Sequence, residues 1–192
     1  MTAHAKPYRF TVDEYARMGD AGVFARGQRV ELIEGEIIPL SPHNRPHASR
    51  VARLNTLFVR LFGDTHEVRV GLPLTFQPFS EPEPDFAIVA LEAADAAERH
   101  PSTADLVIEI SDSSMEYDRG EKASLYAKAG IMDYWLVNLR HGRVEVRRQP
   151  AADPGAFYGF NYALTSVHAS GESLTPLAFP HLQLQVTELL GL

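Results

Sequence analysis

The segment Leu106–Ile110 constrains the fold of this chain more than any other part of its sequence. It reads Leu-Val-Ile-Glu-Ile, and such a nearly continuous apolar run is typical of a β-strand that is covered on both faces. Glu109 lies inside the run, where a carboxylate is costly to bury unless it is paired, protonated or bound to a cation. Two interpretations therefore stay open. Glu109 is either a strand-end glutamate that points to solvent or pairs with an arginine, or it is a functional acid.

The rest of the chain supplies strands and helices around that segment. The pattern predicts two short strands within Val30–Ile38, joined by a turn at Glu34-Gly35, and further strands at 67–76, 84–90, 105–111, 133–139, 143–148 and 157–167. Helices are predicted from Thr11 to about 18, within the stretch that opens at Ser41-Pro42 and runs to 62, at 115–129 and at 186–190. Because helices and strands do not alternate regularly, we expect an α/β or α+β fold in one domain over residues 1–192, a central mixed β-sheet flanked by helices.

The helix that ends near residue 62 has one apolar face. Its apolar residues recur at steps of three and four, as helix geometry requires: Val51, Leu54, Leu57, Phe58 and Leu61. Three arginines lie off that stripe and are expected to face solvent: Arg50, Arg53 and Arg60.

Composition narrows the classes of function. The 192 residues include 18 Lys or Arg and 25 Asp or Glu, a net charge of −7 that argues against coating nucleic acid through bulk charge but leaves a local basic groove open. The absence of cysteine excludes thiolate metal sites, thiol nucleophiles and disulfides, and it fits a cytoplasmic location. No apolar run approaches the roughly 18 residues of a membrane span, and the first residues lack the apolar region of a signal peptide, so no membrane partner is expected.

A second acid stands at the start of another apolar strand. Asp85 follows Pro84 and precedes Phe86–Val89, although Pro-Asp alone usually marks only a turn or a strand start. The connection over 91–104 is long enough to reverse the chain, so this strand and the Glu109 strand could pair and bring both carboxylates to one site. Two carboxylates completed by water are what Mg²⁺ recruits.

The predicted helix at 115–129 carries a lysine on the side that faces the sheet. Lys122 shares one helical stripe with Leu125, Tyr126 and Ala129, at steps of three, four and seven residues, whereas Lys128 lies elsewhere on the circumference. The lysine stem could pack while its ammonium escapes to water. Alternatively, the ammonium joins the two acids in one constellation.

Together these elements resemble a known family, the mostly bacterial Uma-two-type restriction endonucleases of the PD-(D/E)XK nuclease superfamily. The resemblance extends from about 11 to 146 and rests on an ordered set of elements: Val30-Glu31-Leu32-Ile33-Glu34-Gly35-Glu36-Ile37, Pro84-Asp85, Leu106–Ser111, Asp118-Arg119-Gly120-Glu121-Lys122, Tyr126, Gly130 and Asp133–Val137, with His47 at the start of the long helix. It implies a restriction-endonuclease-like fold, a mixed sheet between helices with the active site at one end.

The resemblance also implies catalytic residues. Asp85 matches the aspartate of the superfamily motif, and Glu109 matches its (D/E) position. The motif lysine should stand two residues after Glu109, where this chain has Ser111 instead. In the family a lysine on the following helix substitutes, and Lys122 is its match here.

The implied activity is hydrolysis of DNA phosphodiester bonds with Mg²⁺, for which Mn²⁺ can substitute. Asp85, Glu109 and the Ile110 carbonyl would hold the metal, which activates a water. Lys122 would stabilise the transition state. Glu31 matches a further acidic position that often completes such sites, with Glu34 and Glu36 as neighbouring alternatives. Three more residues are expected to support the ligands or contact phosphate: His47, Ser111 and Tyr126.

Three functions stay open at this point. A DNA endonuclease needs the acids and the lysine to converge in an open cleft, and a homodimer would suit cleavage of both strands. A binding module without turnover would show the acids apart or blocked. A hydrolase of small phosphoesters would show a closed pocket. In either enzyme, clustered acids should give at least one carboxyl group a raised pKa, with Lys122 opposing the shift.

Overall fold

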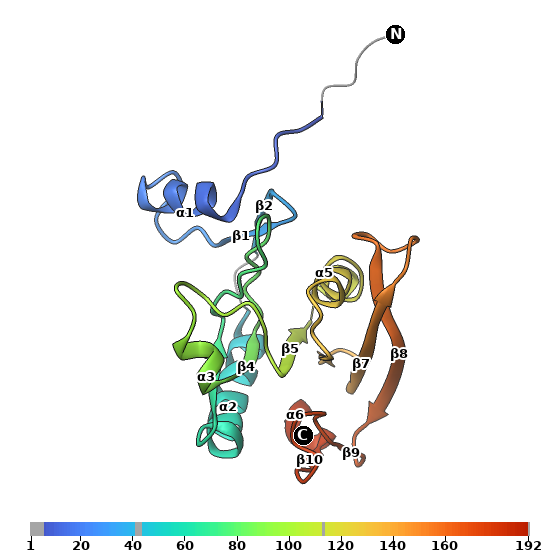
Figure 1. Ribbon diagram of the computed structural model, residues 1–192. Coiled ribbons are helices and arrows are strands. Elements are labelled where there is room, and N and C mark those ends of the chain that lie inside the picture. The colour runs from blue at the N-terminus through green and yellow to red at the C-terminus, as the bar shows by residue number, and fades with distance from the viewer. Residues whose placement is uncertain (1–5, 41–43, 113, 192) are drawn as a thin grey trace.

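A six-stranded mixed sheet forms the centre of the computed structural model, which describes residues 6–40, 44–112 and 114–191. Its strands, in spatial order, are β3 (His66–Val70), β4 (Phe86–Ala90), β5 (Leu106–Ser111), β6 (Asp133–Asn138), β7 (Arg143–Ala152) and β8 (Phe160–Ala169). β5 and β6 are parallel and all other neighbours are antiparallel. The mixed sheet flanked by helices confirms the expected α+β class (Figure 1).

Helices and two small hairpins surround the sheet. The helices are α1 (Val12–Asp20), α2 (Arg45–Phe62), α3 (Leu91–Asp95), α4 (Met115–Tyr117), α5 (Ala123–Lys128) and α6 (Val186–Leu190), with a π-helical turn, η1 (Asp118–Lys122), between α4 and α5. The hairpins are β1 (Val30–Ile33) with β2 (Glu36–Pro39), and β9 (Ser173–Leu174) with β10 (Leu184–Gln185). No helix in the described part of the chain is long and apolar enough to cross a membrane.

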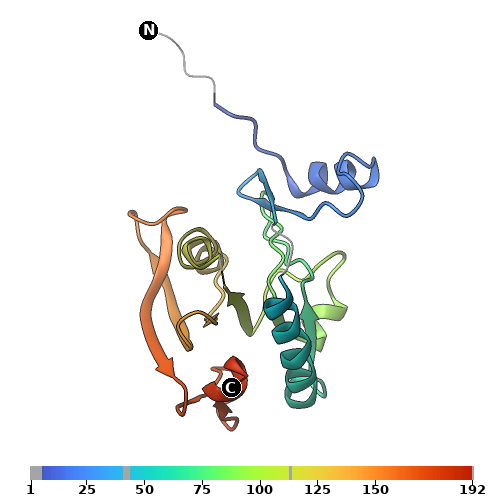
Figure 2. The same cartoon turned by 180° about the vertical axis from the view of Figure 1, so that it is seen from behind.

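The two faces of the sheet pack against different helices, as Figures 1 and 2 show. Residues alternate between the faces along each strand, so Leu106, Ile108 and Ile110 join the core formed with α2 and α6. Val107 joins the second core, with α5 above it. Glu109 has the same parity as Val107, and this alternation turns its carboxylate toward the α5 side.

Local sequence explains the ends of several elements. The side chains of Thr11 and Glu14 form a reciprocal capping box at the start of α1. The predicted turn between β1 and β2 is confirmed, with Glu34 at φ 49° and Gly35 at φ 85°, the left-handed pair that a two-residue hairpin turn requires. The side chain of Asn44 accepts a hydrogen bond from the His47 N–H and thereby caps α2.

The predicted strand over 67–76 is wrong beyond Val70. Gly71 follows at φ 57° and its N–H still donates to the Asp85 carbonyl at 3.1 Å, but Pro73 has no N–H to donate, and the ladder with β4 ends there. The segment after it turns instead toward the β1–β2 hairpin, where Leu32 forms an isolated bridge with Glu81. The alternation of apolar residues therefore continues past the point where backbone pairing ends.

The predicted helix over 115–129 forms, but a π turn interrupts it at Asp118–Lys122. The carbonyl of Asp118 accepts a hydrogen bond from the Tyr134 hydroxyl at 2.9 Å, and the carbonyl of Arg119 accepts one from the Arg147 guanidinium at 3.1 Å. Strands β6 and β7 thus supply partners to carbonyls of the turn. Gly130, at φ 79°, ends the helix as its sequence predicts.

Candidate active site

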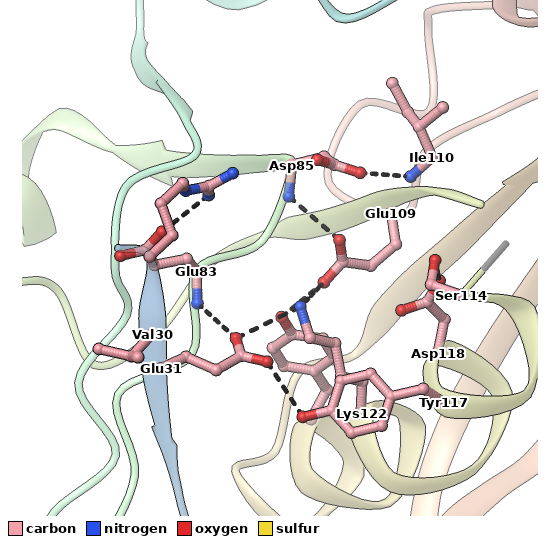
Figure 3. A network of polar contacts seen from close by, with 12 residues as sticks. Val30, Glu31, Glu83, Asp85, Glu109, Ile110, Ser114, Tyr117, Asp118 and Lys122 are labelled. Carbon is pink, nitrogen blue, oxygen red and sulfur yellow. Dashed lines mark hydrogen bonds and ion pairs between the residues drawn. The ribbon is translucent and has the colours of Figure 1, made fainter. Parts of the chain in front are cut away.

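The two predicted acids meet where β4 and β5 separate (Figure 3). Backbone pairing between these strands ends at Phe86 and Ile108. One residue further, the Asp85 N–H donates to Glu109 Oε2 at 3.1 Å, and the Ile110 N–H donates to Asp85 Oδ2 at 2.7 Å. Each carboxylate therefore replaces a backbone partner that the other strand has lost, and both acids lie at the same end of the sheet.

The Lys122 ammonium lies against these carboxylates. Its Nζ donates to Glu109 Oε1 at 2.9 Å, and the Tyr126 hydroxyl donates to the same oxygen at 2.9 Å. Only 4% of Lys122 is exposed, so the alternative in which its ammonium escapes to water does not hold. The shared helical stripe of Lys122 and Tyr126 brings both donors to one oxygen.

Glu31 forms a second ion pair with the Lys122 ammonium, in addition to the pair with Glu109. Its Oε2 lies 3.4 Å from Lys122 Nζ and accepts the Glu83 N–H at 3.1 Å, while its Oε1 accepts the Tyr117 hydroxyl at 3.0 Å. Of the three candidate glutamates only Glu31 reaches the cluster. Glu34 pairs instead with Arg9 and Lys128, and Glu36 is exposed on β2.

The remaining candidates support the acids or the π turn. His47 Nε2 lies 3.0 Å from Asp85 Oδ2. The Ser111 hydroxyl donates to Asp118 Oδ2 at 2.5 Å, and the Ser114 hydroxyl donates to the same oxygen at 2.5 Å. The serine at the motif-lysine position therefore contacts Asp118 and not the ammonium.

Sequence reasoning missed further residues of this cluster, among them Glu83, Ser114, Tyr117 and Asp118. An acid near the start of a helix is ordinarily explained by the helix dipole, which hides the buried position of Asp118. Its place four residues before Lys122, one helical turn away, was the available sign.

A pocket of about 330 Å³ opens at this end of the sheet. Its lining includes Asp85, Glu109, Asp118 and Lys122, together with His47 from α2. The acids and the lysine therefore face one space that a phosphate group can enter.

Comparison with known families agrees with this geometry. The Uma2 family model, described as "Putative restriction endonuclease", matches residues 12–187. The chain belongs to the Uma2 family. In fold it is similar to a crystal structure described as a "putative nuclease belonging to DUF820" from Anabaena variabilis ATCC 29413, with a TM-score of 0.71, 19% identity, and coverage of 95% of this chain and 98% of that one. Curated proteins give no match.

The pKa values of the buried groups in this Uma2 site are shifted in the directions expected where acids and a lysine lie close together. Burial raises the pKa of Glu109, and Asp85 and Asp118 add to the rise while Lys122 opposes it. Burial also disfavours the charged form of Asp85, but hydrogen bonds from His47 and Ile110 hold its pKa below the ordinary value. Lys122 is likewise buried, yet Glu109 and Glu31 hold its pKa well above the ordinary value. The ammonium is therefore charged inside the protein.

The donor set of this Uma2 protein fits a hard divalent cation. Among the described residues, no group of three or more His, Asp or Glu side chains is arranged to hold a metal ion. Asp85 and Glu109 nevertheless supply two carboxylates to one pocket, and Mg²⁺ is commonly bound by one or two carboxylates, substrate phosphate and water. Burial is the main cause of the raised pKa of Glu109, with Asp85 and Asp118 adding to it, and a bound cation would favour the ionised form of this carboxylate.

Proposed function

We propose that this Uma2 protein is an endonuclease that hydrolyses phosphodiester bonds of DNA with Mg²⁺, or with Mn²⁺ in its place. The observation that supports this most directly is the convergence of Asp85, Glu109 and Lys122 on one pocket. Two carboxylates and an ammonium in a partly dry site are suited to a substrate that carries a phosphate.

The proposed roles follow from the contacts. Asp85 and Glu109, with the Ile110 carbonyl, would hold the metal ion, which supplies an activated water and neutralises phosphate charge when bound. Lys122 stabilises the negative charge that develops on the phosphate in the transition state. Glu31 holds the ammonium from the side opposite Glu109, so it positions Lys122.

His47 and Tyr126 act through the acids in this proposal. Each places a polar group on a carboxylate oxygen, His47 on Asp85 and Tyr126 on Glu109. These contacts fix the direction of both carboxylates before the metal binds, which limits the reorganisation that binding requires.

Cleavage of supercoiled plasmid in Mg²⁺, Mn²⁺ or EDTA tests the proposal. The wild-type protein should nick and linearise the plasmid with either metal and not with EDTA. Glu109→Ala should lose the activity, whereas Glu36→Ala, which removes an exposed glutamate, should retain it. Equal cleavage by wild type and Glu109→Ala would refute the assignment. Sedimentation of the active protein tests the predicted homodimer.

The pocket volume favours a second candidate. A volume of about 330 Å³ lies near the lower end of the roughly 300–1,000 Å³ that ligand sites occupy, so a hydrolase of small phosphoesters also fits. Turnover of bis(p-nitrophenyl) phosphate without DNA cleavage would identify that activity. DNA binding with no turnover of either substrate would identify a binding module.

A further inference from the structure

Helix α2 carries a concentration of positive charge without carboxylate partners among the residues that the structure describes. Its 18 residues contain no Asp or Glu but hold four arginines, in a protein whose net charge is −7: Arg45, Arg50, Arg53 and Arg60. Acidic residues outnumber basic ones across the whole chain, so this concentration is opposite to the overall balance.

Within the described ranges, none of these four arginines forms an ion pair, whereas Arg119, Arg147 and Arg148 all bind carboxylates. Arg45, Arg53 and Arg60 are exposed. Burial and the neighbouring Arg53 lower the pKa of Arg50. The charge of the helix is thus available to a partner.

Helix geometry places the exposed arginines in one row. Arg53 and Arg60 are seven residues apart, about two turns, and Arg45 is eight residues before Arg53. The opposite side of the helix packs its buried apolar residues, such as Phe58, into the core beneath the sheet. From Arg45 to Arg60 the row extends about 22 Å at 1.5 Å per residue.

The row begins at the mouth of the candidate active site. Asn44 and His47, at the first turn of α2, line the pocket, and Asn44 donates a hydrogen bond to Asp112 Oδ2 at 2.7 Å on its far wall. From there the helix runs away along the face of the sheet (Figure 2). A ligand that occupies the pocket and continues beyond it can follow this helix.

We propose that the arginine row of α2 (Arg45, Arg53 and Arg60, with Arg50 beside it) binds the phosphate backbone of a nucleic acid whose cleaved phosphate lies in the pocket. The inference rests on the proposed function and gives the substrate a path outside the pocket. Regularly spaced cations suit a regularly spaced polyanion, and about 22 Å corresponds to roughly six base-pair steps of 3.4 Å. Such contacts fix the position of the duplex without reading its sequence.

Fluorescence anisotropy with a fluorescein-labelled 20-base-pair duplex in EDTA tests this path. Arg53→Ala/Arg60→Ala should weaken binding at least tenfold and reduce the slope of log affinity against log salt by about 1.8, or about 0.9 for each lost contact. Arg17→Ala/Arg26→Ala is the matched control, because it removes the same charge from two other arginines without an ion pair among the described residues. Its affinity should remain that of the wild type. Circular dichroism confirms that both variants are folded.

The outcomes separate this inference from the proposed function. Equal affinity and salt slope for the two double variants would overturn the arginine row, even if Glu109→Ala abolishes cleavage. If Arg53→Ala/Arg60→Ala loses duplex affinity while the control variant does not, the result would support binding by the arginine row, even if the wild-type protein cleaves no DNA. Row-dependent sedimentation with phosphatidylglycerol vesicles, combined with row-independent duplex binding, would assign the surface to anionic lipid and refute the proposal.

Discussion

At the scale of single residues, Glu109 is the group on which the candidate site depends. One of its oxygens accepts two hydrogen bonds, from Lys122 and Tyr126, and the other accepts the Asp85 N–H. A buried carboxylate with fewer partners would be too costly to retain. The contacts that offset the cost of burying Glu109 also connect β5 with the start of β4 and with the helical segment that carries Lys122 and Tyr126.

Lys122→Ala tests whether the ammonium acts in the transition state. Cleavage should slow by roughly 10²–10³, because a preorganised charge at the phosphate is lost, while duplex affinity changes little. Lys128→Ala is the control on the same helix, since Lys128 pairs with Glu34 outside the cluster. Single-turnover cleavage rates and anisotropy measure the two effects. A second variant tests the same role from the strand: Ser111→Lys in the Lys122→Ala protein should recover part of the rate. A folded Lys122→Ala protein that cleaves at the wild-type rate would contradict the assignment of Lys122.

Sequence could identify Glu109 and Lys122 because each conflicts with its surroundings, an acid within an apolar strand and a cation on an apolar helical stripe. It offered a weaker sign for Asp118, which lies one turn before Lys122 but near a helix start, where an acid conflicts with nothing. It could not choose among three glutamates. Only the β1–β2 turn, which directs Glu31 inward and leaves Glu36 exposed, decides between them.

At the scale of elements, the π turn is the feature that sequence periodicity could not show. Both Asp118 and Lys122 are 4% exposed, at opposite ends of the turn, and both lie toward the sheet. In a π turn each N–H reaches the carbonyl five residues back and not four, and apolar residues at steps of three and four indicate a helix without marking where such a turn interrupts it. Tertiary contacts accompany the turn, among them the hydrogen bond from the Tyr134 hydroxyl to the Asp118 carbonyl.

Tyr134→Phe tests the link between the π turn and the site. It removes only the hydroxyl of a fully buried side chain and leaves the Asp118 carbonyl without that donor, so urea unfolding should show a loss of about 1–3 kcal/mol. If the turn positions Lys122, the cleavage rate should also fall while KM stays unchanged. Tyr162→Phe is the matched control, because its hydroxyl bonds the Ile131 carbonyl away from the turn. An equal rate for the two variants would separate the turn from catalysis.

At the scale of the whole molecule, the arginines of the sheet are paired with carboxylates, whereas those of α2 have no ion pair within the described part of the chain. Glu145 on β7 is the clearest example of the first group. Its two carboxylate oxygens accept hydrogen bonds from Nε and Nη2 of Arg119, and its Oε2 lies 3.7 Å from Arg147 Nη2. Arg119 belongs to the π turn, so this contact attaches the turn to the sheet. The net charge of −7 therefore coexists with a basic helix and with sheet arginines that are paired with carboxylates.

The Glu145 contact should appear in the pH dependence of folding. Burial opposes its ionisation, but Arg119, Arg147 and Arg143 hold its pKa below the ordinary value of 4.5. A lowered pKa in the folded state stabilises the protein above pH 4.5, and this stabilisation disappears as pH falls through the lowered value. Glu145→Gln should cost about 3 kcal/mol at pH 7 and flatten the dependence of unfolding free energy on pH below 4.5. Urea unfolding at several pH values measures this, with Glu36→Gln as an exposed control. Parallel curves for wild type and Glu145→Gln would show that the arginines do not stabilise the fold through this carboxylate.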